Sequence, residues 1–228
     1  MRRKIPLVEN EIYHIVIRGV EGINIFRDVF DYKRFMTGLY EFNSDKPVSI
    51  WANTRVQRIV QGRSLHNSLV DILTFCLMPN HVHLLLRQKR EKGITDFMKK
   101  LGTGYAVYFN IKYKRSGYVF QGRFRSIHIK NDNQLKTVFV YIHTNPAILV
   151  DKNWKDGVIK NANKIIKFIE HYKWCGYLYY LGKEKKSSHI LTDNFMTQIM
   201  SSSEWQVLVN DWIKYKSGVK DLDSVILE

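Results

Sequence analysis

The sequence has only two cysteines in 228 residues, Cys76 and Cys175. Two cysteines cannot build a disulfide framework or a cysteine-rich metal cluster, and their scarcity favours a reducing, cytoplasmic compartment. Long apolar runs are also missing: uninterrupted ones span only a few residues, as at 84–86, far short of the roughly 20 residues that a membrane-spanning helix needs. The basic opening MRRKIP has no apolar stretch behind it. We therefore expect neither a secretory signal nor a membrane partner.

Acidic residues are absent from the middle of the chain. Residues 99–130 contain no Asp or Glu but eight Lys and Arg, and the whole chain carries a formal net charge of +15. This excess favours a polyanionic partner, and nucleic acid ranks before an anionic membrane surface, which is not among the partners we predict. Aromatic residues alternate with the basic ones, which suits single-stranded nucleic acid because unpaired bases stack on aromatic rings. The alternative is that the aromatics are core and the lysines form a solvated face.

The hydrophobic pattern predicts an α+β fold in which an antiparallel sheet carries packed helices. Predicted strands cover residues 13–17, Val70–Met78, 81–87 and 124–129, with a strand or loop at 48–52. Predicted helices cover residues 31–43, with Asp31 as the cap, 94–111, 131–144, 162–171 and 193–200. We expect Val70–Met78 to be a central strand because it is mostly apolar, and residues 44–68 to be an extended insertion.

Two histidines in the strand at 81–87 point to metal chemistry. His81 and His83 are two residues apart, so both project from the same face of a strand. Two neighbouring neutral imidazoles supply two-thirds of a divalent metal site. The motif is short, and the alternative is that both are merely polar positions at a strand edge. Cys76, inside an apolar strand, is predicted to be a small core residue.

The helix at 131–144 places a phenol beside an amide. Its buried stripe is predicted to contain Leu135, Val138, Phe139 and Ile142. Tyr141 and Asn145 lie one turn apart on a flank of that stripe, over the edge of the sheet. A phenol there can reach a phosphate, and the amide oxygen can complete the coordination of a metal. The alternative is a half-buried aromatic followed by a helix cap before Pro146.

Seven segments in order resemble one family. They are YHIVIRG from Tyr13, IFRD from Ile25, CLMPNHVHLLL from Cys76, LGTGYAVYFN from Leu101, GYVFQGRFRS from Gly117, YIHTNP from Tyr141 and YKWCGYLYYLG from Tyr172. Together they resemble the single-tyrosine HUH transposases, in the branch associated with repetitive extragenic palindromes, over about residues 10–182. The resemblance implies a ferredoxin-like HUH nuclease domain at residues 8–150 and a C-terminal helical extension at 151–228.

The resemblance also implies an activity: metal-dependent cleavage and rejoining of single-stranded DNA near hairpins through a 5′-phosphotyrosine. His81 and His83 match the metal ligands of the family, Asn145 a third-ligand position, and Tyr141 the nucleophile. The implied cofactor is Mg²⁺ or Mn²⁺. One tyrosine holds one strand end, so either a monomer or a homodimer is compatible. Because imidazoles must be neutral to bind a cation, activity is expected to fall below about pH 6.

Five basic residues of the stretch 99–130 are candidates for the DNA backbone surface. They are Lys99, Lys100, Lys112, Arg123 and Arg125, with solubilising charge as the alternative. The chain lacks a P-loop, which agrees with an ester exchange that needs no ATP. Other possibilities are a domesticated nuclease, a non-catalytic DNA-binding protein on the same fold, and a water-using hydrolase or RNA-binding module. If Tyr141 is not the nucleophile, Tyr105 or Tyr108 is next.

Overall fold

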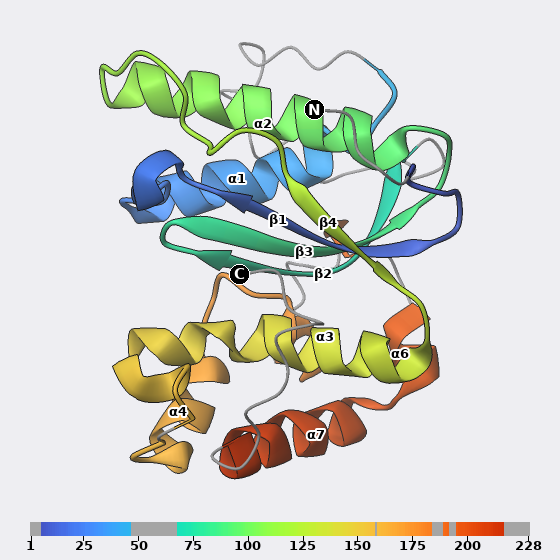
Figure 1. Ribbon diagram of the computed structural model, residues 1–228, viewed down its shortest axis with the longest axis vertical. Helices are drawn as coiled ribbons and strands as arrows, with labels where there is room; N and C mark the ends of the chain where they lie inside the picture. The colour runs from blue at the N-terminus through green and yellow to red at the C-terminus, as the bar shows by residue number, and fades with distance from the viewer. Residues whose placement is uncertain (1–5, 47–67, 158, 184–188, 192–194, 217–228) are drawn as a thin grey trace.

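A computed structural model describes residues 6–46, 68–157, 159–183, 189–191 and 195–216. The chain forms a four-stranded antiparallel sheet with helices on both faces, as Figure 1 shows. The strands are β1 (Ile12–Arg18), β2 (Val70–Met78), β3 (His81–Gln88) and β4 (Arg125–Ile129), in the order β2-β3-β1-β4. The predicted α+β class with an antiparallel sheet is confirmed. The predicted strand or loop at 48–52 and most of the insertion lie outside the described residues.

The helices are divided between the two faces of the sheet. On one face lie α1 (Val29–Glu41) and α2 (Gly93–Lys112). On the other face α3 (Asp132–Thr144) runs beneath the sheet, followed by α4 (Ala162–Ile169), α5 (Tyr177–Tyr180), α6 (Phe195–Ile199) and α7 (Ser202–Tyr215). Short 3-10 helices cover Val20–Gly22, Asn145–Leu149 and Lys152–Trp154. No described helix is both long and apolar enough to cross a membrane.

The start of α1 differs from the prediction. Asp28, not Asp31, is the N-cap, and its carboxylate accepts hydrogen bonds from the N–H groups of Phe30 and Asp31. Asp31 is the third helical residue, and its carboxylate accepts from the N–H of Asp28 in return. This reciprocal capping box satisfies N–H groups that have no partner inside the helix, so the helix begins earlier than its apolar spacing indicated.

Asp31 also joins α1 to α2. Its carboxylate is buried and lies 2.6 Å from the Lys112 ammonium. The phenols of Tyr108 and Tyr113 donate to the same carboxylate at 2.9 and 2.6 Å. Burial alone would raise the pKa of Asp31, but the hydrogen bonds from Lys112 and Tyr113 outweigh it and the pKa is lowered. The charged form of Asp31 therefore stabilises the fold.

We expect Asp31→Asn to lower the free energy of unfolding at pH 7 by about 1.5–3 kcal/mol, the usual contribution of hydrogen bonds to a charged group. Because the pKa of Asp31 is lower in the folded than in the unfolded chain, its ionisation stabilises the fold at every pH above the unfolded-state pKa, which is about 4. This stabilisation is lost as the pH falls below that unfolded-state pKa and through the folded-state pKa. The difference between wild type and variant should therefore shrink between pH 5 and pH 3 in urea unfolding curves. Glu91→Gln, at an exposed pair with Lys92, is the control and should change little.

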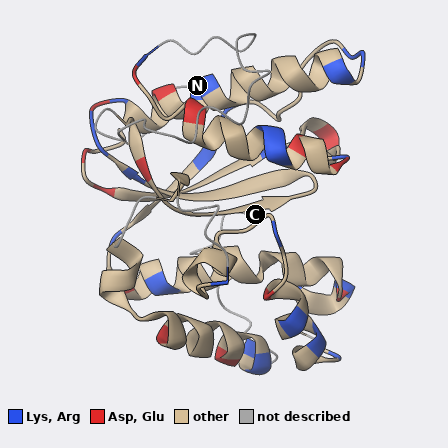
Figure 2. Ribbon diagram, turned by 180° about the vertical axis from the view of Figure 1, so that it is seen from behind, with Lys and Arg blue, Asp and Glu red and all other residues tan. Residues whose placement is uncertain are grey.

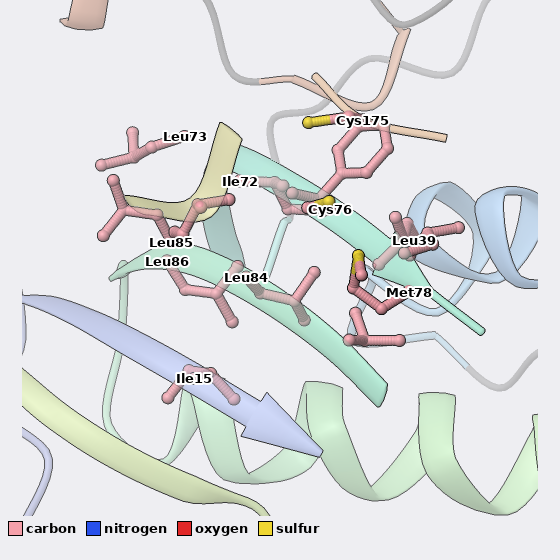
Figure 3. Packing of buried hydrophobic residues seen from close by; sticks show 14 of the residues in the cluster. Ile15, Leu39, Ile72, Leu73, Cys76, Met78, Leu84, Leu85, Leu86 and Cys175 are labelled. Carbon is pink, nitrogen blue, oxygen red and sulfur yellow. The ribbon is translucent and has the colours of Figure 1, made fainter. Parts of the chain in front are cut away.

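The strand β2 is an edge strand, contrary to the expectation of a central one. All nine of its residues are nevertheless buried. The chain around Cys175 lies along its outer edge, where the N–H of Leu77 donates to Trp174 O at 2.8 Å and the N–H of Gly176 donates to Phe75 O at 2.9 Å. Figure 3 shows Cys175 beside β2 and Cys76. An apolar sequence thus shows that a strand is buried, not that it is central in the sheet. The open edge can be covered by a later segment of the chain instead of by another strand.

The C-terminal helices share the core of the sheet domain. Trp205 of α7 is fully buried and packs on Phe139 of α3 with ring centroids 4.0 Å apart. Phe139 also contacts Tyr180 of α5, whose hydroxyl donates to Leu73 O in β2. One apolar cluster therefore runs from the sheet through α3 to α7. Cys76 lies within it, as predicted.

Candidate functional site

The two histidines of β3 face α3. His81 and His83 project from the same side of the strand, as their spacing predicted, and their ring centroids lie 4.8 Å apart at 80°. His83 is fully buried. Its ring meets that of Tyr141 on α3, which shows that this side of the strand is covered by that helix. The sheet and α3 together therefore form the walls of the site.

Tyr141 is brought to the imidazoles by α3. Its ring stands edge-on to His83, with centroids 5.5 Å apart at 86°, and to His14 of β1 at 6.0 Å and 74°. Only 9% of Tyr141 is exposed, so it is more buried than its place on the flank of the stripe indicated. The predicted stripe residues are all buried, but Phe139 packs on α7. Because α3 is covered on both sides, burial does not identify its sheet-facing side.

Asn145 follows the last turn of α3. Its amide nitrogen lies 3.5 Å from Tyr141 O, and its backbone N–H donates to the same carbonyl. The side chain is therefore held at the helix end, which fits the capping alternative and leaves the amide oxygen as the atom available for a cation. No group of three or more His, Cys, Asp and Glu among the described residues could hold a metal ion. A metal bound by the two imidazoles would need a ligand of another type.

His14 is a site residue that sequence reasoning missed. It lies on β1, fully buried, and its Nε2 is 2.9 Å from Nδ1 of His83. The only signal was the period-two alternation of Ile12–Arg18, which places residues 14, 16 and 18 on one face. The outer nitrogens of this pair, Nδ1 of His14 and Nε2 of His83, are buried without a hydrogen-bond partner.

Burial keeps both of these imidazoles neutral. It lowers the pKa of His14 to about 3. Burial also lowers the pKa of His83 well below its usual range, and the neighbouring His81, His14, Arg18 and Lys155 add to the effect. The lowered pKa favours the neutral form of the His83 imidazole, which is the form that can bind a cation.

Two arginines lie on the neighbouring strands β1 and β4, at positions in register with the two histidines of β3. Arg18 is opposite His81 in the β1–β3 register, and Arg125 is opposite Val16, which is itself opposite His83. Directly opposed residues of antiparallel strands share a face, so both arginines start on the face that carries the imidazoles. Arg18 and Lys155 are also near enough to His83 to lower its pKa. This arrangement suits a phosphate group.

The three lysines predicted to contact DNA lie on the opposite face of the sheet from Tyr141. Lys99, Lys100 and Lys112 are on α2, across the sheet from Tyr141. The Lys100 ammonium donates to the carbonyls of residues 44–46, and that of Lys112 is paired with Asp28 and Asp31. Figure 2 shows acidic residues among the basic ones on this layer. Of the five predicted basic residues, the structure puts Arg125 in the row of His83, and the exposed Arg123 two residues before it.

The reserve tyrosines are also on the far side of the sheet. The hydroxyl of Tyr105 donates to Ile25 O at 2.5 Å, and that of Tyr108 donates to Asp31. Burial raises the pKa of Tyr108 to about 12. Neither phenol shares the face of His81 and His83, so the geometry favours Tyr141 over both.

Comparison with known proteins gives one family. A sequence model described as "Transposase IS200 like" matches residues 8–145, more than half of the chain. A solved structure of the REP-associated tyrosine transposase bound to a REP hairpin has 11% sequence identity and a TM-score of 0.49, over 85% of this chain and 92% of that one. No curated protein matches the chain.

Proposed function

The chain belongs to the IS200-like transposase family, and from that premise we propose that it is a metal-dependent transposase acting on single-stranded DNA. In this proposal it cleaves and rejoins the DNA beside hairpins, with Tyr141 as the nucleophile. The observation that carries the proposal is the placement of one phenol, from α3, edge-on to a buried imidazole of the His81 and His83 pair. A protein that only binds DNA needs neither the phenol nor the imidazoles.

The residues present fit a divalent cation. Nε2 of His83 is buried with no hydrogen-bond partner, which is costly unless another atom uses its lone pair. Nδ1 of His81 lies 2.6 Å from Oδ1 of Asn80, an atom that only accepts, so the Nε2 of His81 carries the lone pair. His81 and His83, with the amide oxygen of Asn145, would hold Mg²⁺ or Mn²⁺. The chemistry that such a cation would supply, when bound, is polarisation of a non-bridging oxygen of the scissile phosphate.

Tyr141 carries the covalent step in this proposal. Its phenolic oxygen attacks phosphorus, the bond from phosphorus to the 3′ oxygen breaks, and a 5′-phosphotyrosine and a 3′-hydroxyl result. The phenol loses one proton and the leaving oxygen gains one. A free phenol is only about 0.1% ionised at pH 7. In this proposal the positive charges of Arg18 and Lys155, which act on the nearby His83, attract the phosphate.

A denaturing gel distinguishes this function from the alternatives. The full chain is incubated with an end-labelled single-stranded hairpin oligonucleotide and Mn²⁺, then heated in SDS. A tyrosine transposase gives labelled DNA that migrates with the protein, and EDTA prevents its formation. A water-using hydrolase shortens the DNA without an adduct, and a non-catalytic binder leaves it intact. Either of the last two results contradicts the proposal.

The salt dependence of binding tests the placement of the DNA backbone. We expect Arg125→Gln to flatten the slope of log K against log salt by about 0.7, the value for one lost phosphate contact on a single strand. Lys214→Gln is the control, because Lys214 is exposed on α7, which α3 separates from the sheet. Fluorescence anisotropy between 50 and 300 mM salt measures both slopes. Equal slopes for wild type and Arg125→Gln would remove Arg125 from the interface.

A further inference from the structure

The contact between His14 and His83 lies in the plane of both rings. The nitrogens are 2.9 Å apart and the ring planes differ by only 18°. The ring centroids are 5.2 Å apart. For this N···N distance, that is the largest centroid separation the two rings can have, and they reach it only when both nitrogens lie on the line between the centroids. The rings therefore meet edge to edge in a nearly linear hydrogen bond rather than face to face.

A hydrogen bond between two neutral imidazoles needs one donor and one acceptor. If His14 donates, the proton of His83 resides on Nε2 and that nitrogen cannot bind a cation. If His83 donates from Nδ1, its Nε2 carries the lone pair. One of the outer nitrogens then keeps an unpaired N–H in either case, so burial alone does not choose between the two arrangements.

The neighbouring histidine shows the arrangement that suits a metal ligand. His81 donates from Nδ1 to the amide oxygen of Asn80, a residue that is not one of the proposed metal ligands. His14 occupies the corresponding position toward Nδ1 of His83. In metal sites a ligating imidazole usually donates its second N–H to a group in the next layer of protein, which fixes the tautomer and the ring orientation.

We propose that His14 is a positioning residue, which accepts a hydrogen bond from Nδ1–H of His83 and thereby directs the Nε2 lone pair of His83 toward the cation. This inference rests on the proposed metal-dependent function. His14 has no direct part in the chemistry. Its burial between β1 and α3 makes it a rigid partner, because the neighbouring Tyr141 ring packs against it.

Two variants of His14 separate hydrogen bonding from packing. His14→Phe keeps a flat ring of similar size but has no acceptor. His14→Gln places an amide oxygen near the former position of Nε2 and can still accept. We expect the affinity for Mn²⁺, measured by electron paramagnetic resonance of the free ion, to fall about 10–100-fold in His14→Phe. His14→Gln should stay close to wild type.

A matched control removes another buried imidazole. His143 is also fully buried, lies on α3, and is 2.7 Å from the hydroxyl of Thr74, away from His83. His143→Phe should lower thermal stability as much as His14→Phe does, but leave the Mn²⁺ affinity unchanged. If His143→Phe weakens Mn²⁺ binding equally, loss of packing explains the effect and the inference is overturned.

The ¹⁵N resonances of the His83 ring report the tautomer directly in the metal-free protein. The proton is expected on Nδ1 in wild type and in His14→Gln, and on Nε2 in His14→Phe. A proton on Nε2 in wild type overturns the inference. If the proton is on Nδ1 but wild type binds no Mn²⁺, the hydrogen bond is confirmed and the metal part of the proposed function fails instead.

Discussion

Tyr141→Phe is expected to abolish the SDS-resistant adduct with hairpin DNA, leaving less than about a thousandth of the wild-type rate. The substitution removes only the phenolic oxygen. The aromatic ring that packs edge-on against His83 and His14 remains, so the fold and the DNA affinity should be preserved. The rate of adduct formation is measured on the denaturing gel, and the affinity by anisotropy without added metal.

Tyr118→Phe is the matched control for this experiment. Tyr118 is 86% exposed and precedes the basic segment that leads into β4. Its substitution therefore makes the same chemical change as Tyr141→Phe, but in an accessible phenol. Its adduct should form at the wild-type rate. If the adduct persists in Tyr141→Phe, another nucleophile is at work, and the assignment of Tyr141 is wrong. Peptide mapping of the adduct then identifies the residue.

Trp205→Ala is expected to lower the free energy of unfolding of the whole chain by about 3–5 kcal/mol, as other large-to-small core substitutions do. Trp205 is fully buried against Phe139, and its indole N–H donates to Met196 O at 3.1 Å. For a chain of this length the midpoint of thermal unfolding should fall by roughly 6–20 °C. Because Phe139 and Tyr141 share α3, loosening this contact should also slow cleavage at the same temperature.

Val207→Ala tests whether the effect belongs to the core. Val207 is on the same helix but is 58% exposed. Its replacement should change the free energy of unfolding by no more than about 0.5 kcal/mol. Circular dichroism at 222 nm follows both variants. A single shifted transition in Trp205→Ala indicates that the predicted extension at 151–228 unfolds together with the sheet domain, whereas two separate transitions would show that it unfolds independently.

Strand and helix identities could be predicted because they depend on local periodicity. Val70–Met78 has the predicted bounds, β1 is one residue longer than predicted at each end, and β3 is one residue longer at its C-terminal end. The errors have different physical causes. The burial of the edge strand β2 depends on a chain segment almost 100 residues later, whereas the cap of α1 is decided locally, by which of two aspartates accepts hydrogen bonds from the first N–H groups of the helix. The helix α7 was not predicted at all.

The candidate site was predicted in part for the same reason. His81 and His83 share a face because any strand alternates, and Tyr141 and Asn145 share a flank because any helix turns by about 100° per residue. His14 contributes from a strand nearly 70 residues away, so no spacing within the sequence could reveal it. The lysines of α2 were predicted in one DNA surface with Arg123 and Arg125 because all five lie in the same basic stretch of the chain, and position in the chain does not show on which face of the sheet a helix lies.

Local sequence thus determined the faces of single elements, the excess of positive charge and the family. Tertiary packing decided the rest: which face of α3 meets the sheet, that His14 meets His83, and that Lys112 and Lys100 are engaged within the chain. The physical reason is range. Periodicity and capping act over a few residues, whereas hydrogen bonds and packing in the site join strands and helices whose proximity exists only once the sheet has formed.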